Sequence, residues 1–214
     1  MEAVTRRHHR KDVNTFLDYC ARVKRWIPAN PCDGVAVPEV EEKDVKLLTV
    51  DEGRRLFAAN EGSIVAGRLA LEAFGFLRAS SAGRLQAEDI RFGSRGLRMP
   101  GMEHKSGKTK FRQGHPDNLW AWLNRAPDET WTMKWWEYRN EKRVAFRVAG
   151  IADGSENRLR KTCISAHLAW MKNPAMTSYL AQHRHTSTTE IYQGVMEEAE
   201  ARAWFEIHPR FIFS

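Results

Sequence analysis

The sequence predicts a mostly helical α+β protein with a small three-stranded antiparallel sheet. Two observations support this prediction. Most of the chain has apolar residues at helical spacing, three and four positions apart, in segments bounded by capping residues, Gly or Pro. Residues 94–116 instead show short runs, Gly at turns and alternating polarity, which is typical of short antiparallel strands.

The first expected element is an amphipathic helix over residues 10–27, with apolar residues on one face and Arg and Lys on the other. Two prolines in "IPANPCDG" end it, and an extended acidic segment follows. We therefore predict a linker over residues 35–46, between residues 1–34 and a larger domain over residues 47–214. One helix cannot bury its own apolar face, so we expect residues 1–34 to end an N-terminal helical domain that this chain mostly lacks.

The larger domain is expected to begin with a helix, because Thr49 followed by Glu52 forms a capping box. Asn173 followed by Pro174 combines an N-cap with a proline at the first helical position, which predicts another helix start. The remaining helices are expected in residues 63–77, 117–126, 134–150, 157–171 and about 196–205.

Charge and cysteine content narrow the function. Lys and Arg outnumber Asp and Glu by 34 to 27, which gives a net charge of +7 and permits a polyanionic partner. The three cysteines lack paired spacing, so we expect neither disulfides nor a metal site, and a cytoplasmic setting. No signal-peptide pattern occurs, and the apolar stretches are shorter than the roughly 20 residues of a membrane helix, so we expect no membrane partner.

The basic residues collect in two clusters. One lies on the predicted sheet and its turn and contains Arg98, Lys105, Lys108, Lys110 and Arg112. The other lies on two helices and contains Arg139, Lys142, Arg143, Arg147, Arg158, Arg160 and Lys161. Either cluster alone fits a solvated surface, but together they favour contacts with the phosphates of double-stranded DNA. His104 and His115 flank the lysine turn and are expected at the surface.

The stretch "LAQHRHTSTTEIYQG", residues 180–194, has two histidines around an arginine, then Thr and Ser, then a lone tyrosine. By itself it fits a basic loop and a helix start, with Thr188 or Thr189 as the cap. Tyr192 would then be a half-buried packing residue.

Four motifs, taken together and in order, resemble those of the tyrosine recombinases, or phage-type integrases. "FGFLRASSAGRLQAEDI" is similar to the motif of the first catalytic arginine and contains Arg78. "EHKSGKTKFRQG" resembles the lysine-bearing hairpin and offers Lys105. "NRLRKTCISAHL" is similar to the His-x-x-Arg box and offers Arg160. "LAQHRHTSTTEIY" resembles the final motif and offers His183 and Tyr192.

The resemblance implies an integrase-type catalytic domain over residues 47–214, preceded by the remnant of a core-binding domain. It implies a site-specific recombinase that cleaves and rejoins DNA through a 3′-phosphotyrosine on Tyr192. Arg78 and Arg160 would clamp the non-bridging phosphate oxygens. The covalent intermediate keeps the energy of the broken bond. We therefore expect no metal ion, ATP or other cofactor.

The resemblance also gives roles to the other site residues. Lys105 would protonate the departing 5′ oxygen, and His183 would donate a hydrogen bond to the phosphate. The residues expected to contact DNA are Lys108, Lys110, Arg112, Arg158, Lys161 and Arg184.

Three positions depart from the family pattern. Asn157 stands where His is usual, and it completes the expected catalytic set although an amide cannot accept a proton at neutral pH. Ser81 replaces a supporting carboxylate, and Gln182 replaces Gly. These changes predict a slower enzyme. Two alternatives stay open: a DNA-binding remnant of a mobile element that does not cleave, and a type IB topoisomerase, which uses a similar residue set.

Assembly and location follow from the same resemblance. We expect a cytoplasmic protein, associated with the nucleoid when bound to DNA, that is a monomer when free and a tetramer on synapsed sites. An apolar stripe after Tyr192 consists of Val195, Met196, Ala199, Ala203 and Trp204. The stripe either docks on a neighbouring subunit or folds back on its own domain.

Overall fold

A computed structural model of the chain describes residues 3–37, 46–99, 109–152, 157–183 and 185–210. The chain divides into two compact units, residues 1–44 and 45–214. This division falls within the segment predicted as a linker. The assignment of the first unit to an N-terminal core-binding domain stays a prediction.

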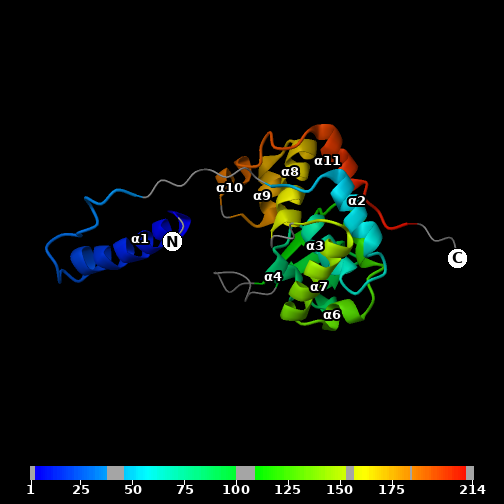
Figure 1. Cartoon of the computed structure of the whole chain (residues 1–214), viewed down its shortest axis with the longest axis horizontal. Helices are drawn as coiled ribbons and strands as arrows, with labels where there is room; N and C mark the ends of the chain where they lie inside the picture. The colour runs from blue at the N-terminus through cyan, green and yellow to red at the C-terminus, as the bar shows by residue number, and fades with distance from the viewer. Residues whose placement is uncertain (1–2, 38–45, 100–108, 153–156, 184, 211–214) are drawn as a thin grey trace. The chain divides into compact units, whose positions relative to one another are not determined.

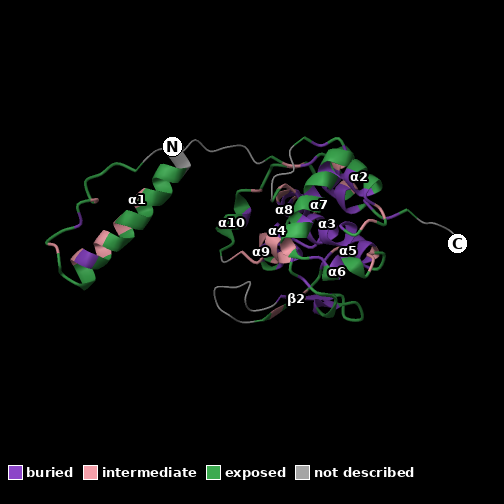
Figure 2. Cartoon of the chain, turned by 60° about the horizontal axis from the view of Figure 1, so that its bottom comes forward, coloured by how far each residue is buried: buried purple, intermediate pink, exposed green. Residues whose placement is uncertain are grey.

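The first unit contains helix α1 (Ala3–Asp18) and a π-helical turn, η1 (Tyr19–Val23). The buried side chain of Asn30 donates hydrogen bonds to Oδ1 of Asn14 at 3.1 Å and to Oδ1 of Asp18 at 2.9 Å. These bonds fold the segment after η1 back onto α1. The side chains of Phe16 and Trp26 are nevertheless exposed, and α1 is exposed along most of its length (Figure 2).

The second unit combines a small sheet with helices (Figure 1). Its strands are β1 (Ile90–Arg91), β2 (Gly96–Met99) and β3 (Lys110–Gln113). The longer helices are α2 (Val50–Ala59), α3 (Ala66–Ala73), α5 (Asp117–Leu123), α7 (Trp135–Val148), α8 (Arg158–Met171), α9 (Pro174–Ala181) and α11 (Glu198–Phe205). The short helices are α4 (Ala79–Ala82), η2 (Ala87–Asp89), α6 (Glu129–Thr132) and α10 (Ser187–Glu190).

The sheet is antiparallel, and its strands lie in the order β1, β2, β3. Leu97 of β2 pairs with Ile90 on one side and with Arg112 on the other. The predicted fold class, mostly helical with a three-stranded antiparallel sheet, is therefore confirmed.

Two helix starts follow the local signals in the sequence. At α2, the hydroxyl of Thr49 accepts from the backbone N–H of Glu52 at 3.1 Å, and the Glu52 carboxylate accepts from the N–H of Thr49 at 2.9 Å. At α9, Oδ1 of Asn173 accepts from the N–H of Met176 at 2.9 Å. Both predicted caps are confirmed, because each needs only residues within one turn.

Helix α3 lies at the centre of the core and is buried along its whole length (Figure 2). It packs against α8 and α5, while α11 packs along α8. The buried indole of Trp204 on α11 donates to the carbonyl of Ala73 at 3.0 Å. The predicted apolar stripe is therefore divided, because Trp204 is buried against its own unit while Val195 and Ala199 are exposed.

Helix α3 ends at Ala73, four residues before the end predicted from the sequence. A Cβ at Gly75 would lie 2.6 Å from the carbonyl oxygen of Leu71, so only glycine fits this turn. Phe76 follows in the left-handed conformation, with φ 63°, which is uncommon for a residue other than glycine. The apolar spacing therefore continues beyond the end of the helix, and the chain turns at Gly75 and Phe76, just before Arg78.

Candidate active site

Arg78 lies directly after this turn, where it precedes the first residue of α4. Its backbone is extended, with φ −68° and ψ 151°, and its side chain is exposed. The turn therefore presents the guanidinium of Arg78 at the surface of an otherwise buried segment.

Arg160 lies in the first turn of α8, and only 5% of it is exposed. Its guanidinium donates to the carbonyl of Phe76 and, at 2.5 Å, to the carbonyl of Ala181. One side chain therefore connects the turn before Arg78 with the C-terminal end of α9.

His183 follows the end of α9, and a Schellman motif fixes its position. The N–H of His183 donates to the carbonyl of Ser178 at 3.0 Å, and the N–H of Gln182 donates to that of Tyr179 at 3.2 Å. Gln182 has φ 58°, the left-handed conformation that glycine adopts without steric penalty. This geometry gives a physical reason for the glycine that the family pattern has at this position.

Tyr192 lies beside His183. The two rings stack with centroids 6.4 Å apart and planes at 17°, and the phenol is half-buried. Nδ1 of His183 lies 2.8 Å from the hydroxyl oxygen of Thr189, whose carbonyl accepts from the N–H of Tyr192 at 3.0 Å. Helix α10 thus joins the histidine to the tyrosine.

The charges of these groups affect one another. Burial and then the charges of Arg160 and Arg78 lower the pKa of His183 to about 4, so its imidazole is neutral at pH 7. Burial and then Arg78 lower the pKa of Arg160 to about 10, which leaves it cationic. Burial raises the pKa of Tyr192, and the two arginines oppose this rise. These mutual effects and the ring contact place Arg78, Arg160, His183 and Tyr192 close together, although they come from three different motifs.

This arrangement has a definite chemical capacity. Two guanidiniums can bind the oxygens of one anion, and in a partly buried site their attraction for developing negative charge exceeds that in water. A phenol beside them can act as a nucleophile once its proton is removed. The combination suits attack on a phosphate group.

The other predicted catalytic residues are Asn157 and Lys105. Asn157 precedes α8, is exposed, and makes no side-chain capping bond. Lys105, Lys108 and Arg184 lie outside the described residues.

The residues predicted to contact DNA differ in their exposure and in their bonding partners. Lys110 and Lys161 are partly exposed. The guanidinium of Arg112 lies 4.3 Å from the centre of the Tyr179 ring. Arg158 donates to the carbonyl of Leu47 at 2.8 Å and to the carboxylate of Glu52 at 3.0 Å. These bonds use Nε and Nη2 of the guanidinium, so Arg158 has a structural role as well as a predicted DNA contact.

Two expectations about surface residues are wrong. His115 is only 7% exposed and packs beside the rings of Phe76 and Trp120. Lys142, assigned to a basic cluster, is buried against Glu72. Both errors have one cause, because the type of a titratable residue does not indicate which distant segment of the chain will cover it.

Sequence reasoning missed the role of Thr189. The pair of threonines predicted a helix start, but only Thr189 is buried and in contact with His183, whereas Thr188 is exposed. The Thr-Thr pattern was the available signal, and it does not say which hydroxyl faces inward.

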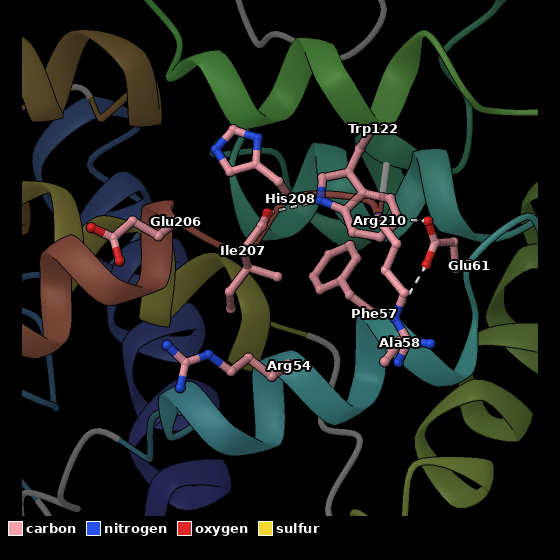
Figure 3. Close-up of a pocket in the computed structure, with 9 residues that line it drawn as sticks. All are labelled: Arg54, Phe57, Ala58, Glu61, Trp122, Glu206, Ile207, His208 and Arg210. Atoms are coloured by element: carbon pink, nitrogen blue, oxygen red, sulfur yellow. Dashed lines mark hydrogen bonds and ion pairs between the residues drawn. The ribbon is translucent and has the colours of Figure 1, made fainter. Parts of the chain in front are cut away.

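A pocket of about 270 Å³ lies elsewhere, between α2, α5 and the segment after α11 (Figure 3). Phe57, Trp122 and Ile207 give it an apolar wall, and Glu61 binds the side chain of Arg125 at its edge. None of the predicted site residues lines this pocket.

In the part of the chain that the structure describes, no helix is long and apolar enough to cross a membrane. Among the same residues, no group of three or more His, Cys, Asp or Glu side chains could hold a metal ion.

No family model matches the chain, but comparison with known proteins finds tyrosine recombinases and an integrase. The tyrosine recombinase XerC of Vibrio parahaemolyticus serotype O3:K6 is 26% identical over 216 residues, which span 92% of this chain and 69% of that protein. The XerA recombinase is similar in structure, with a TM-score of 0.58 and 15% identity, over 94% of this chain and 84% of that one. A lambda integrase dimer bound to a COC′ core site has a TM-score of 0.62 and 14% identity, over 90% of this chain and 74% of that one.

The two solved structures establish the fold, and the similarity to XerC extends over most of the sequence. Together these similarities in sequence and fold support a catalytic domain of the tyrosine recombinase and phage-type integrase kind in this chain.

Proposed function

We propose that this protein is a site-specific DNA recombinase that cleaves and rejoins strands through a 3′-phosphotyrosine at Tyr192. The proposal rests on the proximity of Arg78, Arg160, His183 and Tyr192. The two cations can stabilise the charge that develops on the phosphate oxygens, the neutral imidazole can donate a hydrogen bond to them, and the phenol can attack phosphorus.

In the proposed mechanism, Arg78 and Arg160 hold the non-bridging oxygens of the scissile phosphate. Tyr192 loses its hydroxyl proton to solvent and attacks phosphorus, its oxygen forms the new P–O bond, and the 5′ oxygen leaves with a proton from Lys105. His183 donates a hydrogen bond to the phosphate, and Asn157 can donate another through its amide. The reverse attack by a 5′ hydroxyl rejoins a strand and releases the tyrosine.

We further propose that the reaction needs no metal ion or ATP. The two guanidiniums supply the positive charge, and the phosphotyrosine conserves the energy of the broken bond. Undiminished cleavage and rejoining in EDTA, without nucleotide, is the expected result. Loss of cleavage in EDTA that Mg²⁺ restores would contradict this part of the proposal.

Double-stranded DNA is the proposed substrate, in a cytoplasmic, nucleoid-associated setting. The DNA-bound lambda integrase supports this partner, as does the net charge of +7. The side chains proposed to contact phosphates are Lys108, Lys110, Arg112, Arg158, Lys161 and Arg184.

A nicked suicide duplex tests the proposed chemistry, because the short fragment released after cleavage diffuses away and traps the covalent complex. We expect a protease-sensitive band on a denaturing gel for the wild type and for Tyr179→Phe, and none for Tyr192→Phe. Tyr179 is a suitable control because it is also partly exposed. A covalent band from Tyr192→Phe would show that the nucleophile is another residue.

One alternative has an observation in its favour. Asn157 occupies the position of a proton acceptor and is exposed, which fits a DNA-binding remnant that does not cleave. DNA binding without a covalent band from the wild type would support the remnant. Strand exchange between two duplexes would separate a recombinase from a type IB topoisomerase.

We also propose a monomer in solution that forms a tetramer only on paired DNA sites. Trp204 is buried in its own unit, so it is not free to anchor a neighbouring subunit. The exposed remainder of the stripe is small compared with the roughly 1,200 Å² that a stable interface buries. Light scattering would test this, and a stable tetramer without DNA would contradict it.

A further inference from the structure

Thr189 contacts the two central groups of the candidate active site at once. Its hydroxyl oxygen lies 2.8 Å from Nδ1 of His183, and its carbonyl accepts from the N–H of Tyr192 at 3.0 Å. The threonine is fully buried, at 0% exposure. Because its position is fixed from both sides, its hydroxyl can determine the state of the imidazole.

A neutral imidazole carries one N–H, on either Nδ1 or Nε2. If the threonine hydroxyl donates to Nδ1, then Nε2 carries the hydrogen and can donate to a ligand. If Nδ1 donates to the hydroxyl oxygen, then Nε2 has only a lone pair and can act as a base. The direction of one hydrogen bond therefore separates two different roles for His183.

The surroundings of Thr189 favour donation by the hydroxyl. Among the residues that the structure describes, Nδ1 of His183 is the only hydrogen-bond partner of this hydroxyl. If the hydroxyl hydrogen pointed elsewhere, a buried donor would be unsatisfied, which costs about 1–3 kcal/mol. Donation to Nδ1 avoids that penalty.

A second His–Thr pair in the same protein has the opposite arrangement. The hydroxyl oxygen of Thr177 lies 2.8 Å from Nδ1 of His167, but its hydrogen is donated to the carbonyl of Asn173 at 2.9 Å. The hydroxyl oxygen of Thr177 must then accept from Nδ1–H. Thr15 and Thr162 likewise donate to the carbonyl four residues earlier, whereas Thr189 makes no such bond.

We propose that Thr189 is a positioning residue that donates its hydroxyl hydrogen to Nδ1 and holds His183 as the Nε2–H tautomer. The imidazole is then a hydrogen-bond donor to the phosphate rather than a base that accepts the proton of Tyr192. This role rests on the function proposed above, but the tautomer itself does not. His167 should show the other tautomer, with hydrogen on Nδ1.

Long-range ¹H–¹⁵N NMR of ¹⁵N-histidine-labelled protein at pH 7 tests the tautomer without DNA. We expect a protonated Nε2 for His183 and a protonated Nδ1 for His167, with signals assigned from His183→Gln and His167→Gln variants. A protonated Nδ1 on His183 in the wild type would overturn the inference.

Variants then test whether the hydroxyl sets this state. Thr189→Val keeps the shape but removes the hydroxyl, so we expect signals from both tautomers of His183. Thr189→Ser should restore the Nε2–H form, and Thr188→Val is the matched control because Thr188 is exposed. An unchanged tautomer in a folded Thr189→Val protein would contradict the role of the hydroxyl.

The suicide duplex supplies the kinetic readout. Thr189→Val should lower the rate of covalent complex formation on the order of tenfold to a hundredfold, as for other groups that orient a histidine, with an unchanged Kd for DNA. Thr189→Ser should recover most of the rate. If the wild type forms no covalent complex but has the expected tautomer, the proposed function fails and the assignment of Thr189 as the group that orients His183 stands. If Thr189→Val cleaves at the wild-type rate, the positioning role fails.

Discussion

Nζ of Lys142 on α7 lies 2.6 Å from Oε2 of Glu72 on α3, and both side chains are shielded from solvent. The hydroxyl of Tyr138 donates to the other oxygen of the same carboxylate at 2.5 Å. This buried cluster holds α7 against the helix that leads into the turn before Arg78. The framework of the candidate site therefore includes a charge pair in the core.

Lys142→Met should lower the free energy of unfolding by about 3–5 kcal/mol, because it removes the cation that lies 2.6 Å from the buried carboxylate of Glu72. Urea denaturation measures the change. Arg143→Met on the exposed face of the same helix is the control and should have little effect. The double variant Glu72→Gln with Lys142→Met should recover part of the loss. A change in Lys142→Met as small as that of the control would contradict the importance of this pair.

Arg158 and Lys161, both proposed DNA contacts, should respond differently to replacement by alanine. Arg158→Ala removes the bonds to Leu47 and Glu52, so we expect a loss of about 1–3 kcal/mol in stability. Lys161→Ala should leave stability nearly unchanged, weaken DNA binding and reduce the salt dependence by about one unit of log–log slope. Denaturation and a salt titration of the Kd measure both. A large loss of affinity with unchanged stability in Arg158→Ala would favour a DNA contact over a structural role.

Gln182→Gly should raise the free energy of unfolding by about 0.5–1 kcal/mol. The present φ of 58° is unfavourable for glutamine and costs nothing for glycine. Gln193→Gly is the control, because Gln193 does not have a positive φ and gains no such relief. Thermal unfolding would measure both variants. A decrease for Gln182→Gly would mean that side-chain contacts of Gln182 outweigh the strain.

Stability should fall as the pH falls below about 6.5. Burial lowers the pKa of His115 to about 3 and that of His167 to about 4, and the pKa of His183 is also about 4. Between pH 6.5 and 4 the unfolded chain binds protons that the folded chain does not, so each group removes up to about 1.4 kcal/mol per pH unit.

His115→Phe tests this pH dependence, since an aromatic ring can keep the packing beside Phe76 and Trp120. The slope of unfolding free energy against pH should decrease relative to the wild type by the contribution of one bound proton, about 1.4 kcal/mol per pH unit. Carboxylates contribute equally to both proteins and cancel in the comparison. Parallel pH curves for the two proteins would be evidence against a buried neutral His115.

Asn157→His should accelerate single-turnover cleavage of the nicked duplex, on the order of tenfold or more, by supplying a proton acceptor for Tyr192. Asn157 is exposed and its side chain makes no capping bond, so the change should not disturb α8. An unchanged or reduced rate would show that another group takes the proton.

The sequence alone determined the features that depend on neighbouring residues or on a resemblance. The caps at Thr49 and Asn173 need only one helical turn, and alternating polarity between turn glycines was enough for β2 and β3, whereas β1 lies just before the segment that shows this pattern. The resemblance singled out Arg78, Arg160, His183 and Tyr192, which the fold brings close together. Their catalytic roles stay predictions until cleavage is measured.

Tertiary structure decided which polar groups are buried and what they contact. Lys142 and His115 look like surface residues in the sequence, but α3 and the aromatic core cover them. Packing also decides that Thr189 rather than Thr188 is buried. It likewise buries Trp204 within its own unit. Burial and hydrogen-bond partners depend on segments that are far apart in the chain. A local pattern of residues does not show which of these segments will pack together.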